Sequence, residues 1–481
     1  MASSVWDCFF CLLPSLLALL LSLALGWPRA RCCTRLAVKA AGWRLWVMIC
    51  LILELPLDRS RGIGVKEVRS PGTGVFGSGQ VLDGLSLFCK PTALARYLLQ
   101  HCVSLARPRL ASWPRGDPHL QTLSSMLFGK HGDRLQFTRD HLLLRDGGIV
   151  ALDWAAASRL SETDRRKRWE GRKEHQSGGF FTAAPPVLLV IPQYWGGMTP
   201  HLQVLCRHAV QQGYKVVVFH ARGTAGCLLT TARLAEFGDP ADLEQVVGYV
   251  HSRYPTSVLV AVSEGSGSGI LLSYLGESGS SSHLTAAAAI SPVLLGQLWF
   301  EVDMPPVYRW GVMFHQKMKL RRYASSFRGV LDVDRALSAS SLRNFEEALS
   351  CSSAPTPPDW ERYWERNEPL RDADEVAVPV LCVCSRDDPL LPPVSSLPLP
   401  LFQSNPYFLM ALTERGGHCG FTLEVLEYFK VVTDFLKCEG REGASRSGLA
   451  TMMRRPKLQP TEGRLVDAEE GSFTWKRSYT R

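Results

Sequence analysis

Short, fully apolar segments alternate with helical segments between residues 187 and 290, and this alternation constrains the fold more than any other feature of the sequence. The apolar runs are VLLVI (187–191), KVVVFH (215–220), SVLVAV (257–262) and LTAAAAI (284–290). Such runs are typical of strands buried within a parallel sheet. The segments between them, such as 201–213, repeat apolar residues at helical spacing. The sequence therefore predicts βαβ units and an α/β fold, with helices on both faces of a mostly parallel sheet.

The alternation stops between about residues 296 and 375. This stretch is rich in Trp, Tyr and Phe and has the spacing of helices and loops, which suits a helical cap inserted over a pocket. The sheet pattern resumes at 379–385 and 407–413, and a last helix is expected over 423–437. The segment 74–86 has the composition of a plain loop. We expect a membrane-anchor or signal segment at 1–60, a linker region at 61–115, one α/β domain at 116–438 and a disordered basic tail at 439–481.

An uncharged run of 19 residues near the N-terminus, Phe9–Trp27, is long enough to cross a bilayer as a helix. No Lys or Arg precedes it, and Arg29, Arg31 and Arg35 follow it. The positive-inside rule then keeps the following chain on the cytoplasmic side. We expect an N-terminal hydrophobic helix that anchors a cytoplasmic-facing domain at the endoplasmic reticulum or a similar membrane. The alternative is a secreted protein, released by cleavage of a signal peptide near Gly26.

Charge and motif spacing exclude several classes of function. The formal charge of +9 over 481 residues is spread along the chain and forms no basic stripe with interleaved aromatic residues, so nucleic acid is not an expected partner. No group of His, Cys, Asp and Glu has the spacing of a metal site, and no glycine-rich segment has the spacing of a phosphate-binding loop. We therefore expect neither a metal nor a cofactor.

A strand that runs directly into a helix, through the sequence VSEGSGSG, holds the first candidate catalytic residue. In a nucleophile elbow the serine lies on a tight strand-to-helix turn, so the residues two before and two after it must be small. Ala261 and Gly265 meet this requirement around Ser263, whereas the flanks of Ser266 and Ser268 do not. Ser263 is therefore the predicted nucleophile, and Ser266 and Ser268 are the alternatives.

An acid and a histidine follow two later strands. Asp388 precedes a proline in SRDDPLLPP and is expected to orient an imidazole, with Asp387 as the alternative. His418 lies in ERGGHCGF, where the glycines permit a close approach to other backbone. The chain order Ser, Asp, His is that of α/β-hydrolases. In such a triad His418 takes the proton of Ser263, and Asp388 stabilises the imidazolium.

The oxyanion of this reaction needs two backbone N–H donors. One is expected from Glu264, directly after Ser263, and the other from Tyr194 or Trp195 in the loop PQYWGGM. The carboxylate of Glu264 would oppose the developing negative charge unless it pointed away or were neutralised.

Further motifs extend the pattern over roughly residues 115–440: PHLQT (118–122), DGGIVALDW (146–154), HARGTAG (220–226), LLTTARLAEFGDPADL (228–243) and GGHCGF (416–421). Together they resemble the fourth family of the α/β-hydrolase superfamily, whose characterised members are lipid esterases and phospholipases. The resemblance implies an α/β-hydrolase fold and places the family's triad on Ser263, Asp388 and His418. The elbow departs from the family's usual Gly-x-Ser-x-Gly-Gly, because AVSEGSGSG has two extra residues before ILLSYLG.

Two functions remain open on the sequence alone. The ordered triad and the resemblance predict a serine esterase that acts on acyl lipids at a membrane surface. The altered elbow favours a catalytically weak or inactive hydrolase fold that regulates lipid metabolism by binding a protein partner. So does the oxyanion loop, where QYWGG stands in place of the family's usual GLTGG-like turn.

Overall fold

The computed structural model of the protein describes residues 80–82, 85–106, 117–127, 135–156, 184–194, 196–302, 304–327, 330–350, 360–419, 421 and 423–441. Within these residues, ten strands form one sheet in the order β1-β2-β10-β9-β8-β7-β5-β6-β4-β3. The strands are β1 (Gln80–Leu82), β2 (Leu85–Phe88), β3 (Phe137–Leu143), β4 (Ile149–Ala155), β5 (Val187–Ile191), β6 (Lys215–His220), β7 (Leu259–Glu264), β8 (Ala286–Ile290), β9 (Val380–Ser385) and β10 (Phe408–Thr413).

The central strands of the sheet, from β10 to β6, are parallel to their neighbours. Antiparallel strands close both edges, with β2 beside β10 and β4 beside β6. β7 lies between β5 and β8, so that Ser263 pairs with Ile191 on one side and with Ala289 on the other. Because parallel strands end at the same edge of a sheet, the loops after β5, β7, β9 and β10 meet there.

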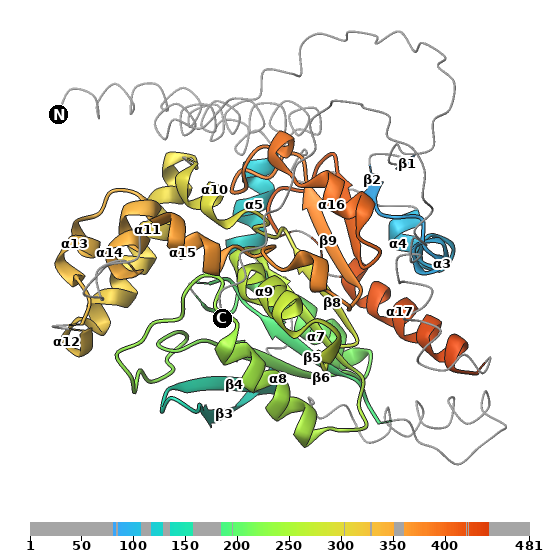
Figure 1. The fold of residues 1–481 in the computed structure, drawn as a ribbon, viewed down its shortest axis with the longest axis horizontal. Helices are drawn as coiled ribbons and strands as arrows, with labels where there is room; N and C mark the ends of the chain where they lie inside the picture. The colour runs from blue at the N-terminus through green and yellow to red at the C-terminus, as the bar shows by residue number, and fades with distance from the viewer. Residues whose placement is uncertain are drawn as a thin grey trace, which may run out of the picture.

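Helices cover both faces of the sheet, as the sequence predicts (Figure 1). On one face, α3, α7 and α17 share a core with Val190 and Val262. On the other face, α8, α9 and α16 share a core with Leu189 and Ala261. These helices and their neighbours are α3 (Ala93–His101), α4 (Val103–Ala106), α5 (Pro118–Leu127), α7 (Pro200–Gln211), α8 (Ala241–Arg253), α9 (Ser268–Ser278), α16 (Leu399–Ser404) and α17 (Leu423–Arg441).

A group of helices between β8 and β9 forms the predicted cap. It comprises α10 (Gly296–Glu301), α11 (Pro306–Arg322), α12 (Ala324–Phe327), α13 (Val333–Ser338), α14 (Leu342–Ser350) and α15 (Trp360–Asn367). These helices lie to one side of the sheet (Figure 1). They have an aromatic core of their own, which includes Trp299, Phe345 and Tyr363 and also takes in Phe237 from the loop before α8.

The prediction of a plain loop over 74–86 is wrong for the part that the structure describes. Leu85 and Ser86 belong to β2, which pairs with β10, and β1 pairs with β2 in turn. The side chains of Leu85 and Leu87 are buried in the main core. Residues 85–106 therefore belong to the same sheet-and-helix unit as the rest, and not to a linker.

Some sequence predictions concern residues outside the described ranges. The apolar run Phe9–Trp27, Trp195 and nearly all of the tail at 439–481 are among them. Within the described ranges, no helix combines the length and the apolar character that crossing a membrane requires.

Candidate active site

The strand-to-helix turn after β7 has a glycine at its sharpest point. β7 ends at Glu264, and Gly265 follows with a φ of +52°. A short 3₁₀ turn over Gly265–Gly267 then leads into α9. A positive φ at a strand-to-helix turn is the strained geometry of a nucleophile elbow, and glycine adopts it without the penalty of a Cβ atom. The structure therefore places Gly265 at the position of the elbow's central residue.

Close packing against the residue after β5 also places Gly265 at the centre of the elbow. A Cβ atom on Gly267 would lie 2.0 Å from the carbonyl oxygen of Pro192, so only glycine fits there. An elbow needs a small residue two positions after its centre for this reason. With Gly265 at the centre, Gly267 is that residue and Ser263 is the residue two before it.

Ser263 does not lie on the turn, which corrects the sequence prediction. It is inside β7, and alternation along the strand places it on the same face as Ala261, toward the core that α8 and α9 share. Its side chain is fully buried, and its Oγ atom has no hydrogen-bond partner. The structure does not bring Ser263 into hydrogen bonding with His418.

The two alternative serines have structural partners. Ser268, at the start of α9, accepts a hydrogen bond from the Val293 N–H at 2.9 Å and donates to the Val293 carbonyl at 3.3 Å. Ser266 accepts a hydrogen bond from the backbone N–H of Tyr194 at 3.1 Å. Ser266 thus ties the elbow to the loop after β5.

Asp388 and His418 form the predicted pair. The Asp388 Oδ2 atom lies 2.8 Å from the Nδ1 atom of His418, and both side chains are buried. Burial alone would lower the pKa of the imidazole, but the carboxylates of Asp388 and, beyond it, Glu264 raise that pKa above its ordinary value. His418 is therefore a stronger base than a free imidazole.

Asp387, the alternative acid, holds the histidine loop instead of the ring. Its Oδ1 atom accepts hydrogen bonds from the N–H groups of Gly416 and Gly417, at 3.0 and 2.9 Å. The His418 N–H donates to Thr122 Oγ1 of α5 at 3.0 Å. The two neighbouring acids thus have different roles. Asp388 orients the imidazole of His418, and Asp387 holds the backbone of the loop that carries it.

The imidazole of His418 points at the elbow glycine. A Cβ atom on Gly265 would lie 3.0 Å from the Nε2 atom of His418 and 3.4 Å from Cγ and Cδ of Gln193. In a serine hydrolase this Nε2 atom takes the proton of the nucleophile. The position opposite His418 carries no side chain in this protein, and the Gln193 side chain lies beside it.

Glu264 points away from the elbow. Its carboxylate accepts a hydrogen bond from Thr199 Oγ1, at 3.1 and 3.0 Å from its two oxygens, and lies 3.4 Å from His201 Nδ1. Thr199 caps α7, so the carboxylate lies at the N-terminal end of that helix, where negative charge is stabilised. The predicted repulsion of an oxyanion by this carboxylate is thus reduced by its direction and its partners.

The predicted oxyanion donors shift with the register of the elbow. With Gly265 at the centre, the residue directly after it is Ser266, so the N–H of Glu264 is no longer in that position. The N–H of Tyr194 is engaged by Ser266 Oγ. Sequence reasoning missed Gln193 and gave other roles to Gly265, as a small residue beside the nucleophile, and to Ser266, as an alternative nucleophile.

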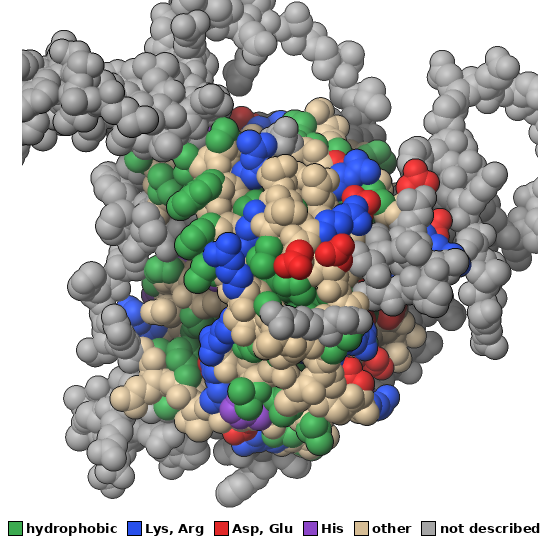
Figure 2. Space-filling view, turned by 90° about the vertical axis from the view of Figure 1, so that its left-hand side faces the viewer, with side chains coloured by type: hydrophobic (Ala, Val, Ile, Leu, Met, Phe, Trp, Pro, Cys, Tyr) green, Lys and Arg blue, Asp and Glu red, His purple; other side chains and the backbone are tan. Residues whose placement is uncertain are grey.

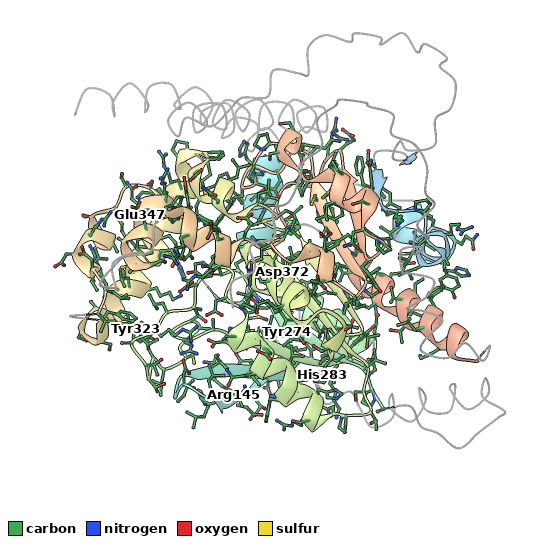
Figure 3. The ribbon with its side chains drawn as sticks, viewed as in Figure 1. Arg145, Tyr274, His283, Tyr323, Glu347 and Asp372 are labelled. Carbon is green, nitrogen blue, oxygen red and sulfur yellow. The ribbon has the colours of Figure 1, made fainter. Side chains whose placement is uncertain are left out.

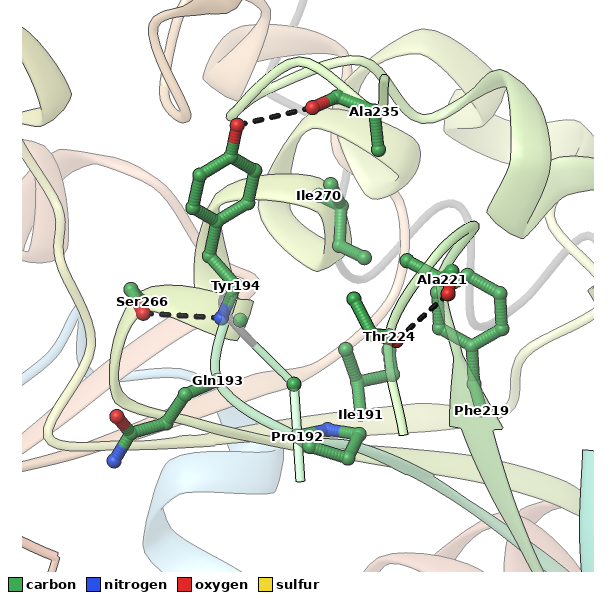
Figure 4. Close-up of a pocket in the computed structure, with 12 residues that line it drawn as sticks. Ile191, Pro192, Gln193, Tyr194, Phe219, Ala221, Thr224, Ala235, Ser266 and Ile270 are labelled. Atoms are coloured by element: carbon green, nitrogen blue, oxygen red, sulfur yellow. Dashed lines mark hydrogen bonds between the residues drawn. The ribbon is translucent and has the colours of Figure 1, made fainter. Parts of the chain in front are cut away.

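A cavity of about 20 Å³ lies beside the elbow, lined by Tyr194, Ser266, Ile270 and residues of β5 and β6 (Figure 4). This volume has room for about one water molecule. An acyl chain does not fit into it without movement of the surrounding side chains.

Polar contacts join the cap to the loops around the elbow. Tyr194 donates to the carbonyl of Ala235 at 3.0 Å (Figure 4). Its hydroxyl also donates to Glu346 Oε1 of α14 at 3.2 Å. Tyr323, at the end of α11, donates to the carbonyl of Cys227 at 3.0 Å (Figure 3). Hydrogen bonds through Tyr194 and Tyr323 therefore connect the cap to the loops after β5 and β6.

The chain is similar to several known proteins. No family model matches the chain. The chain is 45% identical over 417 residues to the human Protein ABHD15, covering 83% of this chain and 86% of that protein. It is 27% identical over 348 residues to the Phospholipase ABHD3 of Bos taurus, covering 68% of this chain and 77% of that one. A solved esterase of Pyrococcus furiosus matches with a TM-score of 0.38 and 13% identity, covering 65% of this chain and 98% of the esterase.

Proposed function

Because the chain belongs to the α/β-hydrolase domain family that includes the human Protein ABHD15, we propose that it acts in lipid metabolism as a hydrolase-fold protein without serine-esterase chemistry. The carrying observation is Gly265 at the centre of the elbow, opposite His418. An acyl-enzyme needs a nucleophilic oxygen or sulfur at that point, and glycine supplies neither. The protein is then catalytically weak or inactive as an esterase.

The rest of the site supports a role in binding. The relative named as a phospholipase suggests acyl lipids as the ligand class. The buried Asp388–His418 pair and the aromatic core of the cap leave the framework of such a site in place. In this role the protein binds acyl lipid or a regulatory protein partner and does not turn the lipid over rapidly.

A second candidate function is slow ester hydrolysis in which water replaces the serine. The raised pKa of His418 favours it, because a more basic imidazole removes a proton from water more readily. The proton would pass from water to the Nε2 atom, and the hydroxide oxygen would attack the ester carbonyl. The bond between the acyl carbon and the alcohol oxygen would then break, and the imidazolium would return its proton to the leaving alcohol. Such a reaction forms no covalent intermediate.

Membrane anchoring remains part of the proposal. The uncharged run Phe9–Trp27 and the three arginines that follow it support an uncleaved anchor with the domain on the cytoplasmic side. Mass spectrometry of the N-terminus of the protein isolated from cells tests this. A mature chain that begins after Gly26 would contradict anchoring and favour secretion.

A fluorophosphonate probe tests the absence of a nucleophilic serine. The full chain in detergent is treated with the probe and compared with the variants Ser263→Ala and Ser266→Ala, with Ser268→Ala as a control in α9. We expect no specific labelling in any of them. Labelling of the wild type that disappears in Ser263→Ala would overturn the proposal and restore Ser263 as the nucleophile.

The water reaction has its own test. Hydrolysis of a short acyl ester by the wild type is compared with Gly265→Ala and His418→Ala. In Gly265→Ala the added methyl group would fill the space opposite His418 Nε2, so slow hydrolysis by water should fall in both variants. Equal rates in all three proteins would assign the residual hydrolysis to some other part of the molecule.

A further inference from the structure

The outward face of α11 carries a row of exposed apolar side chains. Trp310, Phe314 and Met318 are 70%, 54% and 48% exposed, and we call them the α11 stripe. They are spaced four residues apart, so they lie on one side of the helix. The rings of Trp310 and Phe314 stack with their centres 5.4 Å apart. The stripe is therefore a continuous apolar surface.

The opposite face of α11 is already buried in the cap. Tyr308, Met313, Gln316 and Leu320 are the buried residues of this helix. A helix that packs one apolar face into a core normally turns a polar face to solvent. α11 is apolar on both sides, so the stripe is not explained by the packing of the cap.

The charges of α11 all have the same sign. Over 306–322 the helix contains five basic residues, Arg309, Lys317, Lys319, Arg321 and Arg322, and no Asp or Glu. Arg321 and Arg322 are exposed at the end of the helix that follows Met318. The face of the molecule on the cap side shows hydrophobic side chains interspersed with Lys and Arg, together with some Asp and Glu (Figure 2).

We propose that the α11 stripe docks the cap onto an anionic membrane surface. Trp and Phe side chains with neighbouring arginines are characteristic of helices that lie in the interface of a bilayer. The apolar side chains would enter the boundary between headgroups and acyl chains, while Arg321 and Arg322 contact lipid phosphates or carboxylates. Protein interfaces are also rich in Trp, Phe, Met and Arg. The choice of a membrane therefore rests on the single sign of the charges on α11 and on the N-terminal anchor that would hold the cap beside a bilayer.

With the proposed N-terminal anchor, the α11 stripe needs only weak affinity for the membrane to remain bound to it. An N-terminal anchor would hold the cap close to the bilayer, where the effective concentration of the surface is high. The inference rests on the proposed membrane anchoring of the chain but not on the proposed loss of serine chemistry. It also gives the cap a fixed orientation toward its proposed lipid ligands.

Quenching of Trp310 by brominated lipid tests the docking. The full chain is reconstituted into vesicles of phosphatidylcholine and phosphatidylserine, about 7 to 3, with and without bromine on the acyl chains. The variant Trp310→Phe keeps the stripe apolar and removes only this fluorophore. Subtracting the fluorescence of this variant from that of the wild type gives the fluorescence of Trp310 alone. We expect brominated lipid to quench at least about half of it.

Matched variants separate docking from general effects. Phe314→Glu with Met318→Glu should abolish the quenching of Trp310, and Arg321→Glu with Arg322→Glu should reduce it several-fold on the anionic vesicles. Leu143→Glu is the control, because Leu143 is also 70% exposed but lies on β3. No quenching of Trp310 in correctly folded, reconstituted protein would overturn the inference. Protection of Trp310 through pairing of two copies, seen by cross-linking at the stripe, would overturn it as well.

Discussion

The Nε2 atom of His418 lies 3.0 Å from the position that a Cβ atom on Gly265 would occupy. Asp388 holds the other nitrogen of the same ring at 2.8 Å. The acid and the base of a triad are thus aligned on a backbone position that has no side chain. The relationship predicts that one substitution changes the chemistry of the site.

Gly265→Ser should install a nucleophile. Its Oγ atom would extend from a Cβ atom that is already in contact with the imidazole, so His418 can accept its proton. We expect the variant to react with a fluorophosphonate probe that leaves the wild type unlabelled. The positive φ of residue 265 should lower the free energy of unfolding by about 1–3 kcal/mol. Labelling and thermal unfolding are measured on the same preparation.

Two variants control this experiment. Gly265→Ala has the same backbone strain without a hydroxyl and should remain unlabelled. Gly265→Ser combined with His418→Ala should lose most of the reactivity gained. Equal labelling with and without His418 would show that the ring does not activate the new serine.

The Asp388–His418 pair predicts a pH-dependent contribution to stability. The pKa of His418 is raised above its ordinary 6.5 in the folded protein, so protons bind the folded state more tightly than the unfolded state. The contribution is therefore fully present below pH 6.5 and is lost as the pH rises through the raised pKa. The difference in unfolding free energy between the wild type and His418→Gln should shrink across that window in denaturant titrations.

The same pair can be followed directly by NMR. Asp388→Asn removes the carboxylate next to the ring and should lower the pKa of His418, read from its Hε1 resonance. Asp387→Asn is the matched control, because Asp387 contacts the amides of Gly416 and Gly417 and not the ring. A pKa of His418 that is equally low in both variants would contradict the division of roles between the two acids.

The sequence predicts the central strands well and the edges poorly, for a physical reason. Strands such as 187–191 and 215–220 are buried on both sides and are therefore uniformly apolar. β3, in contrast, is an edge strand whose side chains are mostly exposed or half-buried, and its sequence FTRDHLL carries no such signal. β2 was also missed because four residues are too few to show a period.

The elbow shows where sequence reasoning fails at the site. If the family motif is aligned with Ser263 as its central residue, two extra residues remain before ILLSYLG. If Gly265 is the central residue, none remain. The two extra residues thus indicate that the elbow is centred on residue 265. This was overlooked because a catalytic elbow is expected to have a serine at its central position. The positive φ of Gly265, the close packing at Gly267 and the direction of His418 reveal the glycine there. The Asp388–His418 pair was predictable, because each residue lies in the loop that follows a strand of the same sheet.

Close packing at Gly267 predicts a large difference between two glycine substitutions. In Gly267→Ala the new Cβ atom would lie 2.0 Å from the Pro192 carbonyl oxygen, so the backbone must move, at about 1–3 kcal/mol. A Cβ atom on Gly248, in α8, would meet nothing within 4 Å, and Gly248→Ala should stabilise that helix by about 0.5–1 kcal/mol. Thermal unfolding of both variants measures the contrast. Similar melting temperatures would show that the turn at Gly267 yields easily.

Arg222 predicts a second contrast, between a buried and an exposed ion pair. Its guanidinium is 2% exposed and donates to Asp242 of α8 and to Asp146 of the loop before β4, both at 2.6 Å. Arg222→Ala leaves Asp242 buried without its partner, so we expect a loss of about 3–5 kcal/mol in the free energy of unfolding. Arg335→Ala is the control, because Arg335 is 56% exposed and lies 3.6 Å from Glu347, and it should change stability by about 0–1 kcal/mol. Denaturant titration of the two variants decides the matter: a small loss for Arg222→Ala would show that water replaces the guanidinium beside Asp242.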